Sequence, residues 1–273
     1  MMPPPALERH ADTMLRIWDE GLLQEPPSAV DGGFGIVEAY AISAELLRRR
    51  ETAGWRRLGR KIGFTNSAVM REYGMSAPIF GYLYDRTVIH AEDDRAALSL
   101  GGTVQPKIEP EIVFKLRDSP PVTRDPGALL ESVEWLAQGF ELVQCHYPGW
   151  AFAAPDAIAD SGFHARYAVG RPTPVEPGAV AGLVRELAAF RAELLLDGDV
   201  AATGGGEAVL GSPLHALAHL IEVLAGLPGH PPLEAGELVT TGTLTAALPV
   251  APGQAWTTRI SGLPVTPLEL RLM

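Results

Sequence analysis

The chain has 273 residues, of which 47% are hydrophobic and 20% are charged, and its formal net charge at pH 7 is −11. This length suits one large domain, or a domain with a helical extension at its N-terminus, and it buries enough surface to fold without a disulfide or a structural metal. The hydrophobic fraction excludes a disordered chain, and the negative charge disfavours nucleic acid or an anionic membrane as a partner.

The one cysteine, Cys145, cannot form an internal disulfide, which is typical of a protein from a reducing compartment. The N-terminal segment lacks the basic and apolar regions of a signal peptide. No stretch approaches the roughly 18 consecutive apolar residues of a membrane span. The sequence therefore predicts a soluble, cytoplasmic protein that has no membrane partner.

Two amphipathic helices are expected at the start of the chain. Apolar residues recur at near-helical spacing from Ala6 to Leu23 and from about Ile36 to Thr52, and a segment rich in Pro and Gly separates the two. We expect residues 1–55 to form a helical section that packs on the core. Residues 56–273 are expected to form a mixed-β domain that carries the chemistry.

The pattern of apolar residues changes after residue 55. Short apolar or alternating runs, separated by turn residues every 8 to 12 positions, indicate a predominantly β core. Arg60 to Thr65 is expected to form a strand, followed by a small helix that Asn66 can cap. Asp197-Gly198 is typical of a type I′ turn and predicts a hairpin.

Two further helices interrupt the predicted strands. One is expected from about Gly127 to Trp135, and the other follows Ser212, which can serve as its N-cap ahead of Pro213. The pattern as a whole predicts the α+β class, with a helical front section and a mixed β core.

Glu109 and Glu111 form the most informative motif. Alternating apolar residues of this segment occupy one face of a strand, so the two carboxylates project from the other face, about 7 Å apart. With a third oxygen ligand they can chelate one hard divalent cation. The alternative is an ordinary strand with its polar face in water. Because Pro110 has no N–H to donate, we expect this part of the strand at a sheet edge or a bulge.

A third acidic residue, Glu141, lies alone in an apolar strand, where a charge is costly unless it meets a cation. That cation can be a metal ion or the side chain of a Lys or Arg. The loop containing Gly204, Gly205 and Gly206 can cradle a carboxylate or phosphate with its backbone N–H groups. Its spacing matches neither a P-loop nor a dinucleotide-binding motif, and a plain turn is the simpler interpretation.

Other candidate motifs favour structural roles. His215 and His219 stand one helical turn apart, but the segment lacks the glutamate of a metalloprotease helix. Cys145 and His146 are adjacent, and neighbouring residues of a strand point to opposite faces, which disfavours a nucleophilic pair. The absence of a Gly-x-Ser-x-Gly motif disfavours a serine hydrolase.

Taken in chain order, these segments resemble the fumarylacetoacetate hydrolase superfamily, and more closely its branch of 2-oxopent-4-enoate hydratases and 4-oxalocrotonate decarboxylases. The matching stretches extend from the first helices almost to the C-terminus: Gly59–Thr65, Gln105–Ile112, Phe140–Val143, Asp156–Asp160, Leu210–Leu214, Gly236–Thr243 and Gly262–Leu263. The resemblance implies a mixed, mostly antiparallel β-roll core behind the helical section. It also implies a homo-oligomer.

The resemblance implies a site as well. Glu109, Glu111 and Glu141 would bind one Mg²⁺ or Mn²⁺, and Lys61 would lie in the active site. Lys61 could orient the substrate carboxylate, or relay a proton if burial lowers its pKa. The residues that the resemblance places around the substrate are Gly204, Gly205, Gly206, Thr241 and Gly242.

The implied activity is that of a metal-dependent lyase acting on a small 2-oxo acid. In a hydratase, a 2-hydroxy-2,4-dienoate becomes a 4-hydroxy-2-oxo acid through an enolate that the cation stabilises as a Lewis acid. Decarboxylation of a 4-oxalocrotonate-like 2-oxo diacid passes through the same kind of enolate and is the main alternative. Hydrolysis of an acylpyruvate-like 1,3-diketone acid would need a water-activating His/Glu pair, and a non-catalytic subunit is a further alternative.

Two positions depart from the pattern of the hydratases. Ile79 stands where they usually carry an Asp, so one candidate acid or base is missing. His164 ends a stretch that reads Ala-Asp-Asn-Ala-Ser in the family. It could lie near the tail of the substrate and transfer protons as a catalytic residue, or it could be a supporting or surface residue. Both departures keep decarboxylation open.

Overall fold

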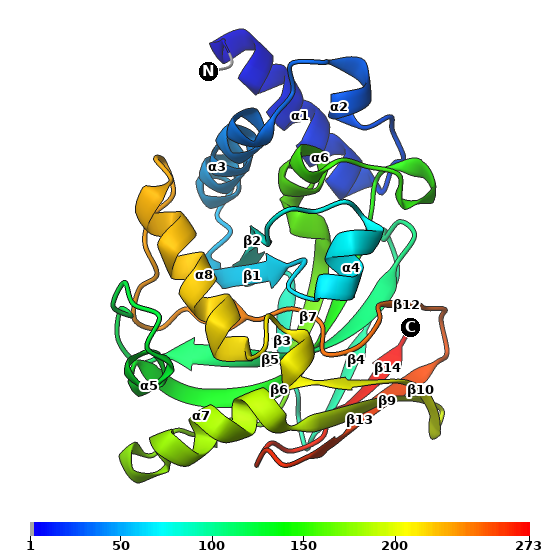
Figure 1. Ribbon diagram of the computed structural model, residues 1–273. Helices are drawn as coiled ribbons and strands as arrows, with labels where there is room; N and C mark the ends of the chain where they lie inside the picture. The colour runs from blue at the N-terminus through cyan, green and yellow to red at the C-terminus, as the bar shows by residue number, and fades with distance from the viewer. Residues whose placement is uncertain (1–2) are drawn as a thin grey trace.

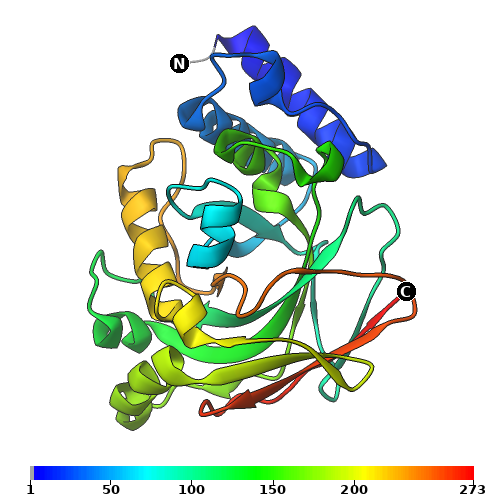
Figure 2. The ribbon, with the colours of Figure 1, turned by 45° about the vertical axis from the view of Figure 1, so that its right-hand side comes forward.

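The computed structural model describes residues 3–273, which combine helices with two β-sheets (Figure 1). The three N-terminal helices gather with α6 at one end of the molecule, and α5, α7 and α8 lie at another side of the sheets (Figures 1 and 2). The α-helices are α1 (Pro4–Glu20), α2 (Pro27–Val30), α3 (Ile36–Thr52), α4 (Ser67–Glu72), α5 (Pro126–Glu131), α6 (Ala154–Ala159), α7 (Val180–Ala189) and α8 (Pro213–Gly226). None of these described helices is both long and apolar enough to cross a bilayer.

The larger sheet carries the candidate site. Its main path runs β2-β1-β11-β5-β6-β7-β3, with β12 paired to β5 and β8 paired to β6. The pairs β1/β11 and β3/β7 are parallel, and the other pairs are antiparallel. Its strands are β1 (Arg57–Gly63), β2 (Ile79–Tyr84), β3 (Val88–His90), β5 (Lys107–Leu116), β6 (Val133–Val143), β7 (His164–Val169), β8 (Thr173–Pro174), β11 (Leu238–Thr240) and β12 (Leu248–Pro249).

The smaller sheet has the order β10-β9-β13-β14-β4, with only the β14/β4 pair parallel. Its strands are β4 (Arg95–Leu98), β9 (Arg191–Leu196), β10 (Asp199–Gly205), β13 (Ala255–Ser261) and β14 (Glu269–Leu272). Antiparallel pairs predominate in both sheets, as the predicted fold class requires. The α+β prediction is confirmed.

The two predicted N-terminal helices both form. Apolar side chains of α1 and α3, including Met14, Ile17 and Leu46, are buried in the largest hydrophobic cluster, to which α6 also contributes. Helix α3 spans the predicted residues. Helix α1 ends earlier than predicted because Gly21 adopts a left-handed φ of 63° at its C-cap, a conformation that glycine tolerates best.

Several local predictions for the β core are confirmed. Asn66 caps α4 and Ser212 caps α8, each accepting a hydrogen bond from the backbone N–H two residues ahead. Asp197 and Gly198 have φ values of 50° and 98°, which fits the predicted type I′ turn between β9 and β10.

Two predictions about this region are wrong. The helix expected from about Gly127 to Trp135 ends at Glu131, because the following residues extend into β6 and pair with β5, with Trp135 opposite Lys115. Long-range pairing here overrides the local helical pattern.

The second correction concerns Pro110. It does not lie at a sheet edge or a bulge, since β5 is an interior strand and Pro110 pairs in register with Phe140 of β6. On its other side the regular ladder stops between β11 and β12, and only the Leu244 N–H reaches the Pro110 carbonyl, at 2.8 Å. The missing proline N–H therefore faces a gap in the ladder rather than an open edge.

Candidate metal centre

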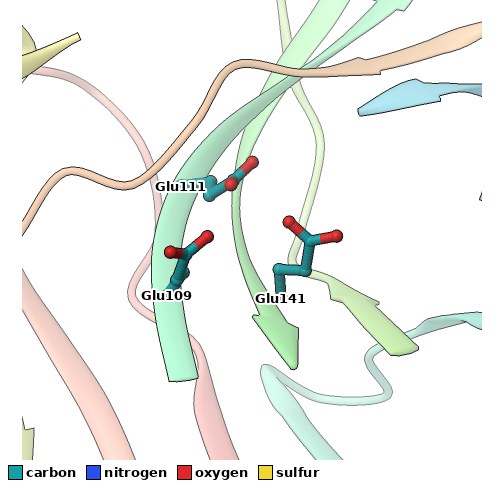
Figure 3. A group of neighbouring side chains, drawn as sticks. All are labelled: Glu109, Glu111 and Glu141. Carbon is teal, nitrogen blue, oxygen red and sulfur yellow. The ribbon is translucent and has the colours of Figure 1, made fainter. Parts of the chain in front are cut away.

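Three glutamates meet on one face of the larger sheet. Glu109 and Glu111 project from β5, and Glu141 projects from β6, directly opposite Glu109 in the ladder. Figure 3 shows the three carboxylates turned toward one shared space. One carboxylate oxygen from each residue lies within 4.8 Å of the others. The predicted strand geometry thus brings both residues of the motif together with the third acidic residue.

Glu111 is the least compensated of the three. It is completely buried, and neither of its carboxylate oxygens has a hydrogen-bond partner among residues 3–273. Burial, together with the charges of Glu141 and Glu109, raises the pKa of Glu111 well above its usual range. Burial also raises the pKa of the partly exposed Glu109 to about 7, against the opposing effect of Lys61.

Such an arrangement is costly for an apo protein. A buried carboxylate normally has hydrogen-bond donors or a cation beside it, and like charges at this spacing repel one another. Three oxygen ligands on one side of a shared space are the donor set of a hard divalent cation. The residues present therefore fit such a cation, and the alternative of a strand with its polar face in water does not fit the burial of Glu111 and Glu141.

Lys61 reaches the same cluster from β1. Its buried Nζ lies 3.2 Å from Glu141 Oε2 and donates a hydrogen bond of 2.8 Å to the Gly162 carbonyl. Burial acts to lower the pKa of Lys61, but the three nearby carboxylates outweigh it and raise that pKa. The structure thus places an ammonium group, not a neutral amine, beside the cluster. Glu141 thus pairs with a lysine and also belongs to the cluster of three carboxylates, so the two alternatives for this residue do not exclude each other.

His164 lies on β7, behind Glu141. Its Nδ1 is 2.7 Å from Glu141 Oε1, and its Nε2 is 2.8 Å from the Thr87 hydroxyl. Burial acts to raise the pKa of Glu141, yet the charge of Lys61 and the hydrogen bond from His164 outweigh it and lower that pKa. With both ring nitrogens engaged, His164 is placed to hold Glu141 in position.

A cavity opens beside Lys61 and Glu109. Three charged side chains and four aromatic rings contribute to its lining. Its lining residues include Lys61, Lys107, Glu109, Phe64, Tyr73, Trp150, Phe163 and Thr243. Phe163 packs against Trp150 and Phe64, with ring centroids 5.3 and 6.3 Å away. The cavity therefore combines charged groups with an aromatic lining.

The glycine and threonine residues expected around the substrate are not among the residues that line the cavity beside Lys61. Gly204 and Gly205 line a separate cavity beside α7, and Gly206 packs against the backbone of Leu187. Thr241 donates its hydroxyl to the Ile112 carbonyl. Gly242, with a φ of 96°, packs so closely on Thr65 that a Cβ would lie 1.9 Å from its hydroxyl oxygen. Thr241 and Gly242 both contact Thr65, which lines the main cavity, since the Thr65 hydroxyl also donates to the Thr241 carbonyl at 3.1 Å.

The chain is similar to enzymes of known activity. No family model matches the chain. A 2-hydroxyhexa-2,4-dienoate hydratase from Comamonas testosteroni is 33% identical over 235 residues, which cover 84% of this chain and 83% of the relative. A 4-oxalocrotonate decarboxylase from Pseudomonas sp. (strain CF600) is 32% identical over 234 residues, covering 83% and 82%. The chain belongs to this family of 2-keto-4-pentenoate hydratases and 4-oxalocrotonate decarboxylases.

A solved structure of a related protein agrees with the family and shows that the fold is shared. The 4-oxalocrotonate decarboxylase from Pseudomonas putida G7, complexed with magnesium and adipate, superposes with a TM-score of 0.89 at 25% identity, covering 100% of this chain and 99% of that one. The fold implied by the resemblance to the fumarylacetoacetate hydrolase superfamily is thereby confirmed, and so is the branch of hydratases and decarboxylases. Its mixed β core behind N-terminal helices is also confirmed.

Two features of the site bear on which reaction of the family it could catalyse. Ile79, which stands where hydratases usually carry an Asp, is buried and lies beside Gly63, whose other neighbour is Lys61 Nζ. An apolar side chain thus occupies the position at which hydratases usually carry a carboxylate. The structure also contains a His/Glu pair, His164 and Glu141, but neither nitrogen of His164 is free to activate water.

Sequence reasoning missed several residues of the site. Lys107, Tyr73 and Trp150 line the cavity, yet they come from three separate segments that no motif connects. Tyr167 stands opposite Glu141 in the ladder, and its buried hydroxyl has no hydrogen-bond partner in the described chain. Only Tyr167 could have been found from the sequence, through Gly139. A glycine inside a strand indicates that another group approaches its backbone closely, and here the Tyr167 ring occupies the space that a Cβ of residue 139 would need.

Proposed function

We propose that this chain is a divalent-metal-dependent lyase acting on a small 2-oxo acid, with Glu109, Glu111 and Glu141 as the metal ligands. The observation that carries the proposal is the pair of buried, unpartnered oxygens of Glu111, which face two further carboxylates. The related decarboxylase from Pseudomonas putida G7, which was solved with magnesium, supports a divalent cation. Mg²⁺ and Mn²⁺ both accept this oxygen ligand set.

Each residue of the site has a role in this proposal. When bound, the cation supplies Lewis-acid stabilisation of negative charge that develops on the 2-oxo group. Glu111 and Glu141 neutralise the cation, and His164 holds Glu141. Lys61 places a positive charge at the cavity wall, where it attracts the substrate carboxylate. The aromatic walls exclude water from the reacting chain.

Within this class, the cavity favours decarboxylation of a 4-oxalocrotonate-like 2-oxo diacid. Loss of CO₂ requires an electron sink at the 2-oxo end and no general acid at the carbon chain. Addition of water requires a group that moves a proton, and the cavity holds no carboxylate besides the proposed ligand Glu109. The apolar Ile79 agrees with this. The order of preference is thus the reverse of the one drawn from the sequence alone.

Hydration of a 2-hydroxy-2,4-dienoate is the second candidate. It is favoured by the identity to the Comamonas testosteroni hydratase, which is as high as that to the decarboxylases. Lys61 is the one residue of the cavity wall near Glu141 that carries a transferable proton. Hydrolysis of a 1,3-diketone acid has less support, because His164 has no free ring nitrogen.

Product analysis by NMR tests the proposal. Metal-stripped protein is mixed with 4-oxalocrotonate or with 2-hydroxypenta-2,4-dienoate, with and without Mg²⁺. We expect Mg²⁺-dependent release of CO₂ from the diacid and little change in the dienoate. A 4-hydroxy-2-oxo product from the dienoate would assign hydration instead. Turnover that is equal with and without metal would contradict the proposed function.

A further inference from the structure

Lys107 is a cation in the cavity that has no anionic partner. Its Nζ donates to the Tyr73 hydroxyl at 3.2 Å and lies 4.1 Å from the centroid of the Trp150 ring. It forms no ion pair with any residue of the described chain. The other two lysines of the sequence are both engaged: Lys61 is paired with Glu141, and Lys115 donates to the Gly236 carbonyl.

The position of Lys107 relative to Glu109 matters. Both lie on the same face of β5, two residues apart, so their Cα atoms are separated by about 7 Å. Lys61 lies on the other side of Glu109, on β1, whose end aligns with the Val113 region of β5 through β11. Both ammonium groups and Glu109 line the same cavity.

The surroundings of Lys107 are built by a defined loop. The side-chain amide of Gln105 donates to the carbonyls of Cys145 and Tyr147, and its oxygen accepts from the Gly149 N–H. Trp150 follows with a left-handed φ of 59°, a conformation that is uncommon outside glycine, and its indole N–H donates to the Gln105 carbonyl. These bonds fix the Trp150 ring against Lys107.

The opposite wall is also fixed. The Tyr73 ring stacks on Phe152, with centroids 5.0 Å apart and an interplanar angle of 15°. Its hydroxyl therefore faces Lys107 from a rigid position. An ammonium group held between a phenol and an indole face, with no ion pair to any described residue, is a recognition site for an anion that enters from the cavity.

We propose that Lys107, supported by Tyr73 and Trp150, binds the distal carboxylate of the substrate and makes the enzyme selective for 2-oxo diacids over 2-oxo monoacids. The inference rests on the proposed function, because that function places the 2-oxo end near Glu109. It assigns Lys107 as a specificity-determining residue. The monoacid leaves this ammonium group without its anion and loses a charge-assisted hydrogen bond.

Calorimetry with unreactive analogues tests the assignment without turnover. The probes are 2-oxoadipate and its monoacid counterpart 2-oxohexanoate, titrated into Mg²⁺-loaded protein. We expect the wild type to bind the diacid about ten to a hundred times more tightly, the range for a hydrogen bond to a charged group. Lys107→Met and Lys107→Gln should remove this preference while binding the monoacid within about twofold of wild type. Lys115→Met, on the same strand face, is the matched control and should keep the preference.

The outcomes separate this inference from the proposed function. If both probes bind only with Mg²⁺ but with equal affinity to the wild type, or if both Lys107 variants keep the preference, the role of Lys107 is overturned and the metal-dependent site remains. If neither probe binds in a Mg²⁺-dependent way, the proposed function fails and the inference fails with it.

Discussion

Replacing Glu111 by glutamine is expected to abolish divalent-metal binding, to lower turnover about a thousandfold or more, and to stabilise the metal-free protein. The loss of turnover follows because the Lewis acid contributes several kcal/mol, and each 1.36 kcal/mol corresponds to about a tenfold change in rate. The gain in stability follows from the burial of Glu111, whose two carboxylate oxygens have no hydrogen-bond partner in the described chain.

The pH dependence of this stability has a defined sign. Burial raises the folded-state pKa of Glu111 well above its usual range. Below the unfolded pKa the residue is protonated in both states and costs nothing. As pH rises toward the folded pKa, the unfolded chain releases a proton that the folded chain still holds, so the free energy of unfolding falls. Glutamine has no proton to release, so the variant should gain thermal stability over the wild type at pH 8, and the difference should disappear near pH 4.

Thermal unfolding with and without Mg²⁺ checks these expectations. Added metal should stabilise the wild type, since it binds only the folded state, and should leave the Glu111→Gln variant unchanged. Glu134→Gln is the matched control, because Glu134 is exposed on β6 and its carboxylate is remote from the cluster. A Glu111→Gln variant that binds metal as tightly as the wild type would remove Glu111 from the ligand set.

Replacing Lys61 by methionine is expected to lower turnover by two to three orders of magnitude and yet to tighten metal binding. The loss corresponds to removing one preorganised charge that stabilises the reacting group. The tighter binding follows because Lys61 is a competing cation, with its Nζ 3.2 Å from Glu141 Oε2. Without metal, the variant should unfold at a lower temperature, since it leaves buried carboxylates without their ammonium partner.

Steady-state kinetics and metal titration of the same preparation check this pair of effects. Lys115→Met is the control for removal of a lysine from the sheet. The two substitutions, at Lys61 and at Glu111, should shift metal affinity in opposite directions while both reduce turnover. Unchanged turnover in Lys61→Met would exclude a role for Lys61 in the reaction, and weaker metal binding would contradict its position as a competing cation.

Part of the site can be predicted from the sequence because strands have a period of two residues. Glu109 and Glu111 must share a face wherever their strand lies, and the flanking apolar residues identify the buried face. Glu141 joins them only through the register of β5 with β6, which no local pattern specifies. The carboxylate cluster can therefore be predicted in part from the residues, and its third member follows from the family resemblance.

Lys107, Tyr73 and Trp150 show why the rest could not be predicted. They reach one cavity from the start of β5, from the end of α4 and from the loop before α6, and their proximity depends on the Gln105 hydrogen bonds. His164 illustrates a different limit. Its sequence position leaves both a catalytic role near the substrate and a supporting or surface role open, and only the structure shows that Glu141 and Thr87 engage both ring nitrogens.

The helices, too, are only partly predictable from the sequence. The apolar stripe of α3 predicts both ends of the helix correctly, because the residues that it contributes to the core are those that the helical spacing selects. The segment after Gly127 has local helical character, yet residues from Val133 onward pair with β5. Where a long-range ladder competes with a short helix, the sequence alone does not decide between them.

The proposed function depends on one divalent cation held by Glu109, Glu111 and Glu141. Crystals of metal-stripped protein soaked in MnCl₂, with diffraction recorded at the manganese absorption edge, test it most directly. We expect a single strong anomalous peak in the space that the three carboxylates face (Figure 3). A strong peak elsewhere, with these carboxylates still unoccupied at saturating Mn²⁺, would contradict it.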